Sequence, residues 1–464
     1  MVFSSMFFLS AFLPITFVVS LLLPKIKQKN IWLILVSLLF YAYGEPIYVL
    51  LMIGSVLVNN VLGNLIVIKP RWDRIWIALC VIFNIGILVF FKYTPMIVQT
   101  INRGFHLNIE IPAITMPIGI SFFTFQAMSY VIDTYRNQQR EKTSFLNALL
   151  YVSFFPQLIA GPIVKYHDIH KEINNRYATA QDIGEGIRRF IIGLAKKVLI
   201  ANTAAQMVDT IYGLPETQIN IVLAWIASFA YVLQIYFDFS GYSDMAIGLG
   251  RMFGFHFKEN FNYPYGAVSV QEFWRKWHIS LSTWFKEYVY IPLGGNRKGK
   301  VRTYLNRYIV FFLTGLWHGA DWSFVVWGLL HGTLLTIENT RYFSIQKIKK
   351  NWLKRIYMFV VVNVTFVIFR GETLAQGFFM IQKMFVTGFS FSAIDKVSVM
   401  GVLTPLNICI LIIGAVLAIP NLKNRLEKSK WFVPISYAGS IGLLLLVMIS
   451  LASNAYNPFI YFRF

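Results

Sequence analysis

The sequence has few charged residues and little cysteine. Only 14% of its 464 residues are charged, whereas a soluble domain averages about 25%, so an ordinary soluble protein is excluded. Its two cysteines, Cys80 and Cys409, lie in apolar stretches, which excludes a disulfide framework and a cysteine-based metal site. Acidic residues are also scarce, with 21 against 42 basic ones and a formal net charge of +21.

The excess positive charge lies in short segments between apolar runs. Such clusters follow the positive-inside rule of membrane proteins, and because they form no basic domain they argue against nucleic-acid binding. Residues 1–29 have no basic region ahead of the first apolar run and no clear cleavage site, so we expect a retained span. The basic clusters that follow residues 3–23 and precede the last span predict that both termini lie outside the cytoplasm.

The chain is rich in hydrophobic residues. Hydrophobic residues make up 56% of it and aromatic residues 17%, and the mean hydropathy is +0.58. A span needs about 20 apolar residues, so the length accommodates roughly ten to twelve spans. We predict an all-α integral protein of the cell membrane, with one polytopic domain over residues 1–464. The last span, at 432–452, is expected to deliver an outer tail, residues 453–464.

Residues 271–332 differ from the rest of the chain. They place His278, His318 and His331 among tryptophans and charges. An imidazole in an otherwise apolar membrane protein is costly, which makes this stretch the candidate site. The spacing of these histidines matches no H-E-x-x-H or Cys/His pattern, so no metal site is expected. We expect His331 to be structural.

The first part of this stretch, residues 271–286, is predicted to be one helix. In it Arg275, His278 and Ser282 share a side, and Trp274 lies on a neighbouring side. We expect Arg275, Ser282, Trp274 and, beside His318, Trp317 to contact the substrate. The segment is too short and polar to span a membrane. It is either an amphipathic helix on the membrane surface, with His278 as one more polar residue, or a helix that directs His278 into a reaction cavity.

His318 follows an apolar run and ends it, in the sequence Trp317-His318-Gly319. Burial of this kind keeps an imidazole neutral, and a neutral imidazole can act as a general base. The alternative is a structural histidine that is hydrogen-bonded to a helix end. Arg297 and Lys298 lie in a loop that lacks the glycine spacing of a P-loop. That loop is either an ordinary cytoplasmic loop or a docking site for a phosphate-bearing acyl donor.

Two carboxylates, Asp238 and Asp244, lie in an apolar region, residues 219–253, which we expect to form two arms around the motif DFSGYSD. Intramembrane carboxylates mark pathways or cavities by default. They could orient a histidine, line a tunnel or satisfy helix ends. The motif is not a nucleophile elbow, because the second glycine is absent.

Five stretches together resemble the membrane-bound O-acyltransferase superfamily, in particular its bacterial branch that acts in alginate, peptidoglycan and teichoic acid modification. They are FFPQLIAGPIVKYHD (154–168), YFDFSGYSDMAIGLGRMFGF (236–255), FWRKWHISLSTWFKEYVYIPLGGNR (273–297), LTGLWHGADWSFVVWGLLHG (313–332) and the terminal FIYFRF. The resemblance implies a ring of about eleven tilted spans around a central tunnel. It also implies that His318 is the family's essential histidine and that His278 occupies its second active-site position.

The resemblance further implies an activity. An acyl group, acetyl or another small one, passes from a cytoplasmic thioester, acetyl-CoA or an acyl-carrier protein, through the tunnel. No bound cofactor is implied. An extracytoplasmic SGNH-type acetyltransferase partner then esterifies a surface polysaccharide. We expect His318 to deprotonate the acceptor, and His278 with Arg275 to position or polarise the donor carbonyl.

The tail offers one acceptor. Tyr461 resembles the terminal aromatic-Tyr motif of the small partner in the D-alanyl branch of the family, so we expect it to carry the acyl group. The alternative is an aromatic anchor at the membrane interface. Other readings of the whole chain are D-alanyl transfer to teichoic acid, a transporter that does no chemistry, and a scaffold for the outer enzyme.

Overall fold

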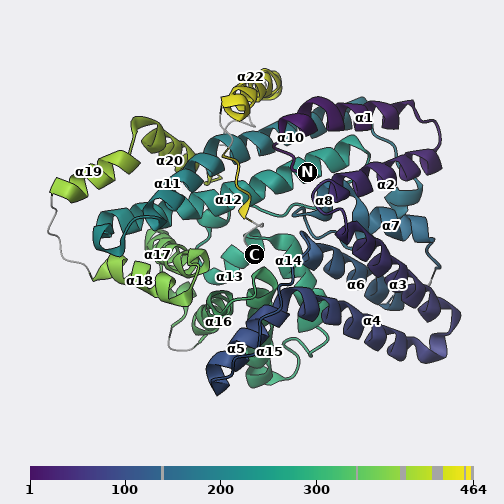
Figure 1. Cartoon of the computed structure of the whole chain (residues 1–464), viewed down its shortest axis with the longest axis horizontal. Helices are drawn as coiled ribbons and strands as arrows, with labels where there is room; N and C mark the ends of the chain where they lie inside the picture. The colour runs from purple at the N-terminus through teal and green to yellow at the C-terminus, as the bar shows by residue number, and fades with distance from the viewer. Residues whose placement is uncertain (137–140, 341–342, 387–392, 421–431, 454–455, 461–464) are drawn as a thin grey trace. The chain divides into compact units, whose positions relative to one another are not determined.

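The computed structural model describes residues 1–136, 141–340, 343–386, 393–420, 432–453 and 456–460, and these residues form helices and connections with no strand (Figure 1). This confirms the predicted all-α class. The described chain packs as two compact units. The first comprises Met1–Phe190 and Ser243–Glu259, and the second Ile191–Tyr242 and Asn260–Phe464. The expectation of a single domain stays a prediction.

The first unit contains the N-terminal helices and parts of α10 and α12. Its helices are α1 (Leu13–Leu22), α2 (Ile26–Ala42), α3 (Tyr48–Ile68), α4 (Asp73–Leu88), α5 (Thr94–Phe105), α6 (Ile120–Arg136), α7 (Phe145–Ser153), α8 (Phe155–Leu158), α9 (Tyr166–Asn174), the first part of α10 (Ala180–Ala195) and the end of α12 (Ile221–Met252).

The second unit contains the rest of α10 and α12, a π-helical segment at Lys196–Ala201 and the C-terminal helices. These are α11 (Asn202–Tyr212), α13 (Val270–Lys276), α14 (Ile279–Phe285), α15 (Gly299–His318), α16 (Trp322–Ile337), α17 (Asn351–Arg370), α18 (Leu374–Phe385), α19 (Ala393–Val402), α20 (Pro405–Leu417) and α22 (Phe432–Ser453).

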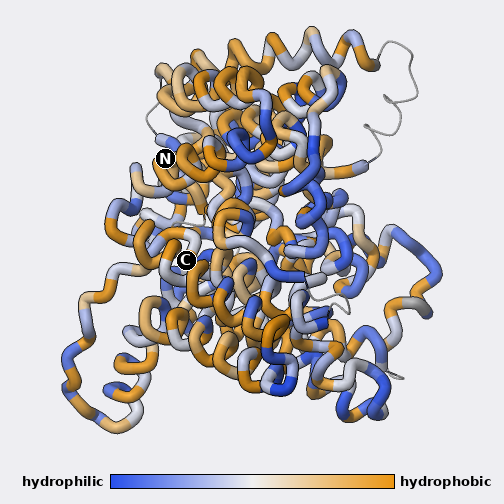
Figure 2. The backbone as a smooth tube through the Cα atoms, turned by 90° about the vertical axis from the view of Figure 1, so that its right-hand side faces the viewer, coloured by the Kyte–Doolittle hydropathy of each residue, from blue (hydrophilic) through white to orange (hydrophobic). Residues whose placement is uncertain are grey.

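Six helical stretches of the described chain are long and apolar enough to cross a membrane, or seven if the bent pair Lys396–Val402 and Pro405–Leu417 forms one span. Figure 2 shows extended apolar stretches along the helices and hydrophilic stretches largely at turns and connections. The chain is a multi-pass membrane protein. The count of about eleven spans stays a prediction, since α1 and α16 are shorter apolar helices.

The expected division of residues 219–253 into two arms is wrong. The motif DFSGYSD lies inside one continuous helix, α12. A Cβ at Gly241 would lie 2.7 Å from the carbonyl oxygen of Gly193. Gly241 therefore allows close packing between helices and does not break α12. The periodicity of a single helix does not reveal such a contact.

The expected single helix at 271–286 is also wrong. It breaks at His278, which has φ 44° and ψ 54°, so that α13 and α14 are separate. The amide of Ile279 donates to the carbonyl of Asn260 at 2.9 Å, and the amide of Asn262 donates to the carbonyl of Lys276 at 2.9 Å. Hydrogen bonds to a distant segment thus replace those that a continuous helix would make.

Helices α15 and α16 form a close hairpin whose turn begins after His318. Glycines permit the approach, because a Cβ at Gly315 would lie 2.4 Å from the carbonyl oxygen of Phe324. Asp321 ends the turn as the N-cap of α16, where its side chain accepts from the amide of Ser323 at 2.7 Å. His318 is therefore held at a fixed helix end.

Candidate active site

The last residue of α15, His318, is 5% exposed and surrounded by aromatic rings. Its ring centroid lies 5.2 Å from those of Trp327 and Phe369, edge to face in both cases, and 5.0 Å from that of Trp317. Helix α16 contributes Trp327 and α17 contributes Phe369. Apolar packing thus fixes the imidazole.

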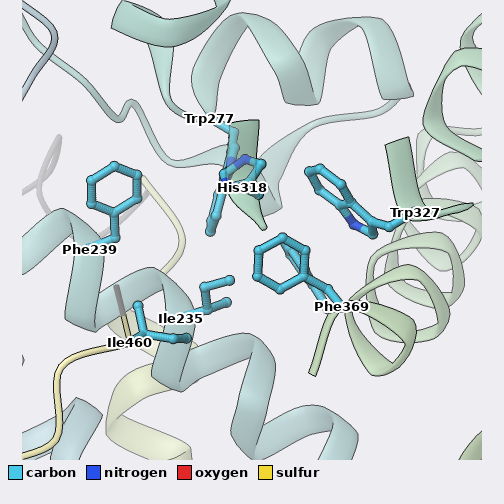
Figure 3. Close-up of a pocket in the computed structure, with 8 residues that line it drawn as sticks. Ile235, Phe239, Trp277, His318, Trp327, Phe369 and Ile460 are labelled. Atoms are coloured by element: carbon cyan, nitrogen blue, oxygen red, sulfur yellow. The ribbon is translucent and has the colours of Figure 1, made fainter. Parts of the chain in front are cut away.

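A small cavity opens beside this imidazole (Figure 3). Its lining is otherwise apolar, and comprises Ile235, Phe239, Trp277, His318, Trp327, Phe366, Phe369 and Ile460. The cavity has room for roughly one water molecule. An acyl group therefore requires a wider cavity than the one in this structure.

His278 is the second imidazole of the site, fully buried at the break between α13 and α14. Its Nδ1 lies 3.2 Å from Oδ1 of Asn260, and this oxygen also accepts from the backbone amide of Ser280 at 3.1 Å and from its hydroxyl at 2.8 Å. An oxygen that accepts from Nδ1 places the proton of a neutral imidazole there. The lone pair is then on Nε2.

The two imidazoles lie close together, with ring centroids 6.3 Å apart and planes at 59°. This spacing allows both rings to reach one small reacting group. Burial, and secondly the repulsion that a protonated His318 would exert, hold the pKa of His278 well below its usual value of 6.5. His278 is therefore neutral at physiological pH. In its Nδ1–H form it accepts a hydrogen bond at Nε2 and cannot donate one there, which differs from the expected polarising role.

His331 is buried where α16 meets α13, and its structural role stays a prediction. Its Nδ1 accepts from Nε1 of Trp274 at 3.3 Å, and its ring lies 5.0 Å from that of Trp327. Trp274 therefore ties α13 to α16. Trp317 lies nearer to the reacting pair, with its ring 5.5 Å from that of His278. Substrate-binding roles for Trp274 and Trp317 stay predictions.

The other polar residues that were predicted to bind substrate do not gather around His278 and His318. Arg275 is exposed whereas His278 is buried, so the break separates two side chains that were expected to share a side. Ser282 is half-buried, and its amide donates to the carbonyl of His278 at 3.1 Å. Arg297 and Lys298 are exposed in the turn before α15. Their roles with substrate stay predictions.

The two carboxylates of the DFSGYSD motif pair with basic residues. Asp238, 2% exposed, lies 2.8 Å from Nζ of Lys197 in the second unit. Asp244 lies 2.8 Å from a guanidinium nitrogen of Arg189 in the first. Among the described residues, no group of three or more His, Cys, Asp or Glu side chains is placed to hold a metal ion.

The C-terminal tail reaches the cavity, because Ile460 forms part of its lining (Figure 3). Tyr461, the proposed acyl carrier, lies outside the described residues. Two residues near the site were not predicted from the sequence, Asn260 and Lys197. A lysine within an apolar run is a signal for a buried partner, and Asp238 was an available one. Asn260 carries no comparable signal.

Comparisons with known proteins identify the family of the chain. The profile of the MBOAT, membrane-bound O-acyltransferase, family matches residues 63–380, more than half of the chain. The chain is 38% identical to a probable alginate O-acetylase AlgI of Pseudomonas putida, over all of both chains. It is also 38% identical to a peptidoglycan O-acetyltransferase of Helicobacter pylori, over 83% of this chain and 80% of that one.

A more remote relative is a teichoic acid D-alanyltransferase of Bacillus subtilis, 28% identical over 51% of this chain and 62% of that one. The matches confirm the resemblance seen in the sequence motifs. They rank the O-acetyltransferases well ahead of the D-alanyltransferase in both identity and coverage. The chain belongs to the membrane-bound O-acyltransferase family and is an O-acyltransferase.

Proposed function

We propose that this enzyme takes an acetyl group from a cytoplasmic thioester and passes it outward for O-acetylation of a cell-surface polysaccharide, of the peptidoglycan or alginate type. The observation that carries the proposal is the His278–His318 pair, with ring centroids 6.3 Å apart beside an apolar cavity. The names of these two relatives, each 38% identical to the chain, support acetyl transfer to these two polymers. We place the enzyme in the cytoplasmic membrane, with both termini outside and about eleven tilted spans around a tunnel.

In the proposed mechanism His318 is the general base. It removes the proton of an acceptor hydroxyl, whose oxygen attacks the thioester carbonyl. The carbon–sulfur bond breaks, and the proton passes from His318 to the departing thiolate. His278 positions the acyl group, and it can polarise the carbonyl only after Nε2 takes up a proton. The apolar lining excludes water and so protects the thioester from hydrolysis.

We propose Tyr461 as the acceptor on the outer side. It follows Ile460 in the chain, and Ile460 lines the cavity that His318 also lines. A phenol has a pKa of about 10, so it needs the base, and its ester is a reactive donor. An extracytoplasmic SGNH-type acetyltransferase would then move the acetyl group from the phenol to its own serine and on to a sugar hydroxyl.

On the cytoplasmic side we propose that a phosphate-bearing donor, acetyl-CoA or an acyl-carrier protein, docks near Arg297 and Lys298. Both side chains are exposed, and an ammonium or guanidinium group binds phosphate well. Arg275 is exposed too and would act at such a surface rather than beside His278.

The experiment is to release esters from surface glycans with mild base, in a deletion strain that carries either the wild-type gene or His318→Ala. Equal accumulation of both proteins in the membrane is the control. We expect acetate to be lost with His318→Ala, and the glycan fraction that loses it to identify the polymer. Loss of ester-linked alanine instead would favour D-alanyl transfer. Retention of the ester would mean that His318 is structural and would favour a transporter or scaffold.

A further inference from the structure

A buried ion pair holds the tail at the cavity. Lys197 lies in the π-helical segment Lys196–Ala201, and Asp238 lies in the middle of α12. Their side chains are 4% and 2% exposed, with Nζ 2.8 Å from Oδ1. The mechanism proposed above uses neither residue, so this buried pair needs another explanation.

Both members of the pair also bind the main chain of the tail, the yellow segment beside α12 in Figure 1. Nζ of Lys197 donates to the carbonyl oxygen of Pro458. Oδ2 of Asp238 accepts from the amide of Ile460 at 2.8 Å. The cation thus meets a backbone acceptor and the carboxylate meets a backbone donor, two residues apart.

Further polar contacts tie the preceding residues. The side-chain amide of Asn202 donates to Oδ1 of Asn457 at 3.1 Å, and the hydroxyl of Tyr456 donates to Asp209. Arg370 donates to the same carboxylate at 2.7 Å. These contacts lie outside the cavity lining, whereas the Lys197–Asp238 pair acts at the residue that enters it, Ile460.

We infer that Lys197 and Asp238 are positioning residues, which hold the tail by its main chain at Pro458 and Ile460 and so set how far the next residue reaches toward His318. A buried ion pair is stable only when its remaining donors and acceptors are satisfied, and the tail supplies two of them. The inference deepens the proposed function, because the register of the tail matters for transfer only if the tail carries the acyl group.

Cysteine labelling tests the position of the tail without any assay of transfer. The background is Cys409→Ser, which removes the exposed thiol and keeps Cys80, a buried one. Ile460→Cys places a thiol at a site that is 4% exposed in the native protein. Purified protein is treated with N-ethylmaleimide, and mass spectrometry of peptides separates the two thiols. Ser453→Cys, at an exposed position, is the control for full reactivity.

The informative variant is the charge swap Lys197→Asp with Asp238→Lys. It keeps an ion pair, but it presents a carboxylate to the carbonyl of Pro458 and an ammonium to the amide of Ile460. We expect labelling of the thiol introduced by Ile460→Cys to become roughly tenfold faster or more, as the loss of charge-assisted hydrogen bonds implies. Cys80 should stay unreactive, which shows that the first unit is folded.

The apolar double variant Lys197→Met with Asp238→Leu guards against misfolding of the swap, because replacing both members of a buried pair is tolerated better than removing one. It should also expose the introduced thiol to the reagent. If that thiol stays protected in both folded variants, the pair does not hold the tail and the inference is wrong. If the thiol becomes reactive and glycan acetylation is unchanged, the anchor stands and the acyl-carrying role of the tail fails.

Discussion

Nδ1 of His278 and Oδ1 of Asn260 lie 3.2 Å apart, in the interior of the second unit. The same oxygen accepts two hydrogen bonds from Ser280, which fixes the amide and therefore the side of the imidazole that carries the proton. The free lone pair of a neutral His278 is then on Nε2. A substitution at Asn260 can therefore change the charge state of His278.

Asn260→Asp should shift the pH dependence of transfer. A carboxylate beside Nδ1 favours the imidazolium and raises the pKa of His278, which burial otherwise holds well below 6.5. We expect weak acyl transfer at neutral pH and recovery as the pH rises and His278 loses its proton. The measurement is transfer from acetyl-CoA in membrane vesicles over a pH series, with Asn260→Ala as control. Higher activity at neutral pH would instead show that protonated His278 polarises the carbonyl.

His278→Asn should abolish transfer and leave the protein folded. The backbone at 278 has φ 44°, and asparagine adopts this left-handed conformation more readily than other non-glycine residues. His106, exposed at the end of α5 with φ 53°, provides a matched control. His106→Asn makes the same change in the same conformation and should keep wild-type acetylation. Wild-type acetylation in His278→Asn would remove His278 from the mechanism.

Gly328→Ala should disturb the site through packing. A Cβ at Gly328 would lie 2.3 Å from the carbonyl oxygen of Phe311 and 3.1 Å from the amide of Gly315, so α16 must move away from α15. Overpacking of this kind costs about 1–3 kcal/mol, and it displaces Trp327, whose ring contacts His318. We expect a lower unfolding temperature and reduced glycan acetylation.

The control for that change is Gly86→Ala on α4, where an added Cβ meets no atom within 4 Å. Alanine is the better helix former by roughly 0.5–1 kcal/mol, so this variant should be at least as stable as the wild type. Equal losses at both glycines would mean that the α15–α16 contact is not specially tight.

The stability of the protein should fall between neutral and alkaline pH through His167. Its Nδ1 lies 2.8 Å from Asp133 and its Nε2 3.3 Å from Asp168, and these carboxylates, Asp133 first, raise the pKa of His167 to about 9. The folded pKa exceeds the unfolded value of about 6.5, so the stabilisation is full below 6.5 and is lost as the pH rises through 9. Thermal unfolding of His167→Gln should therefore approach that of the wild type at alkaline pH.

The sequence allowed much of the fold to be predicted where apolar runs are long. The span at 432–452 corresponds to α22 (Phe432–Ser453), and the apolar run at 3–23 contains α1. The hydrophobic composition of one segment is enough to predict such helices. His278 and His318 were also identified as a pair, and the structure brings their rings together.

The remaining features depend on partners far away in the chain. The break at His278 is fixed by hydrogen bonds to Asn260, which is 18 residues earlier. The need for glycine at position 241 of α12 comes from the close approach of Gly193, which the periodicity of α12 does not encode. The contact between Asp238 and the tail joins residues 222 positions apart. A single sequence without its tertiary contacts does not specify such pairings.

The two anchor contacts on the tail engage peptide groups, so they respond to spacing rather than to the identity of side chains. Phe459 itself is buried, with its ring 5.0 Å from that of Tyr242. An apolar replacement such as Phe459→Leu keeps a buried apolar side chain there and leaves the carbonyl of Pro458 and the amide of Ile460 in place. One residue inserted after Ile460 shifts everything beyond it by about 3.3–3.6 Å of extended chain without touching the anchor. Transfer should therefore tolerate an apolar replacement of Phe459 far better than a change in the length of the tail beyond Ile460.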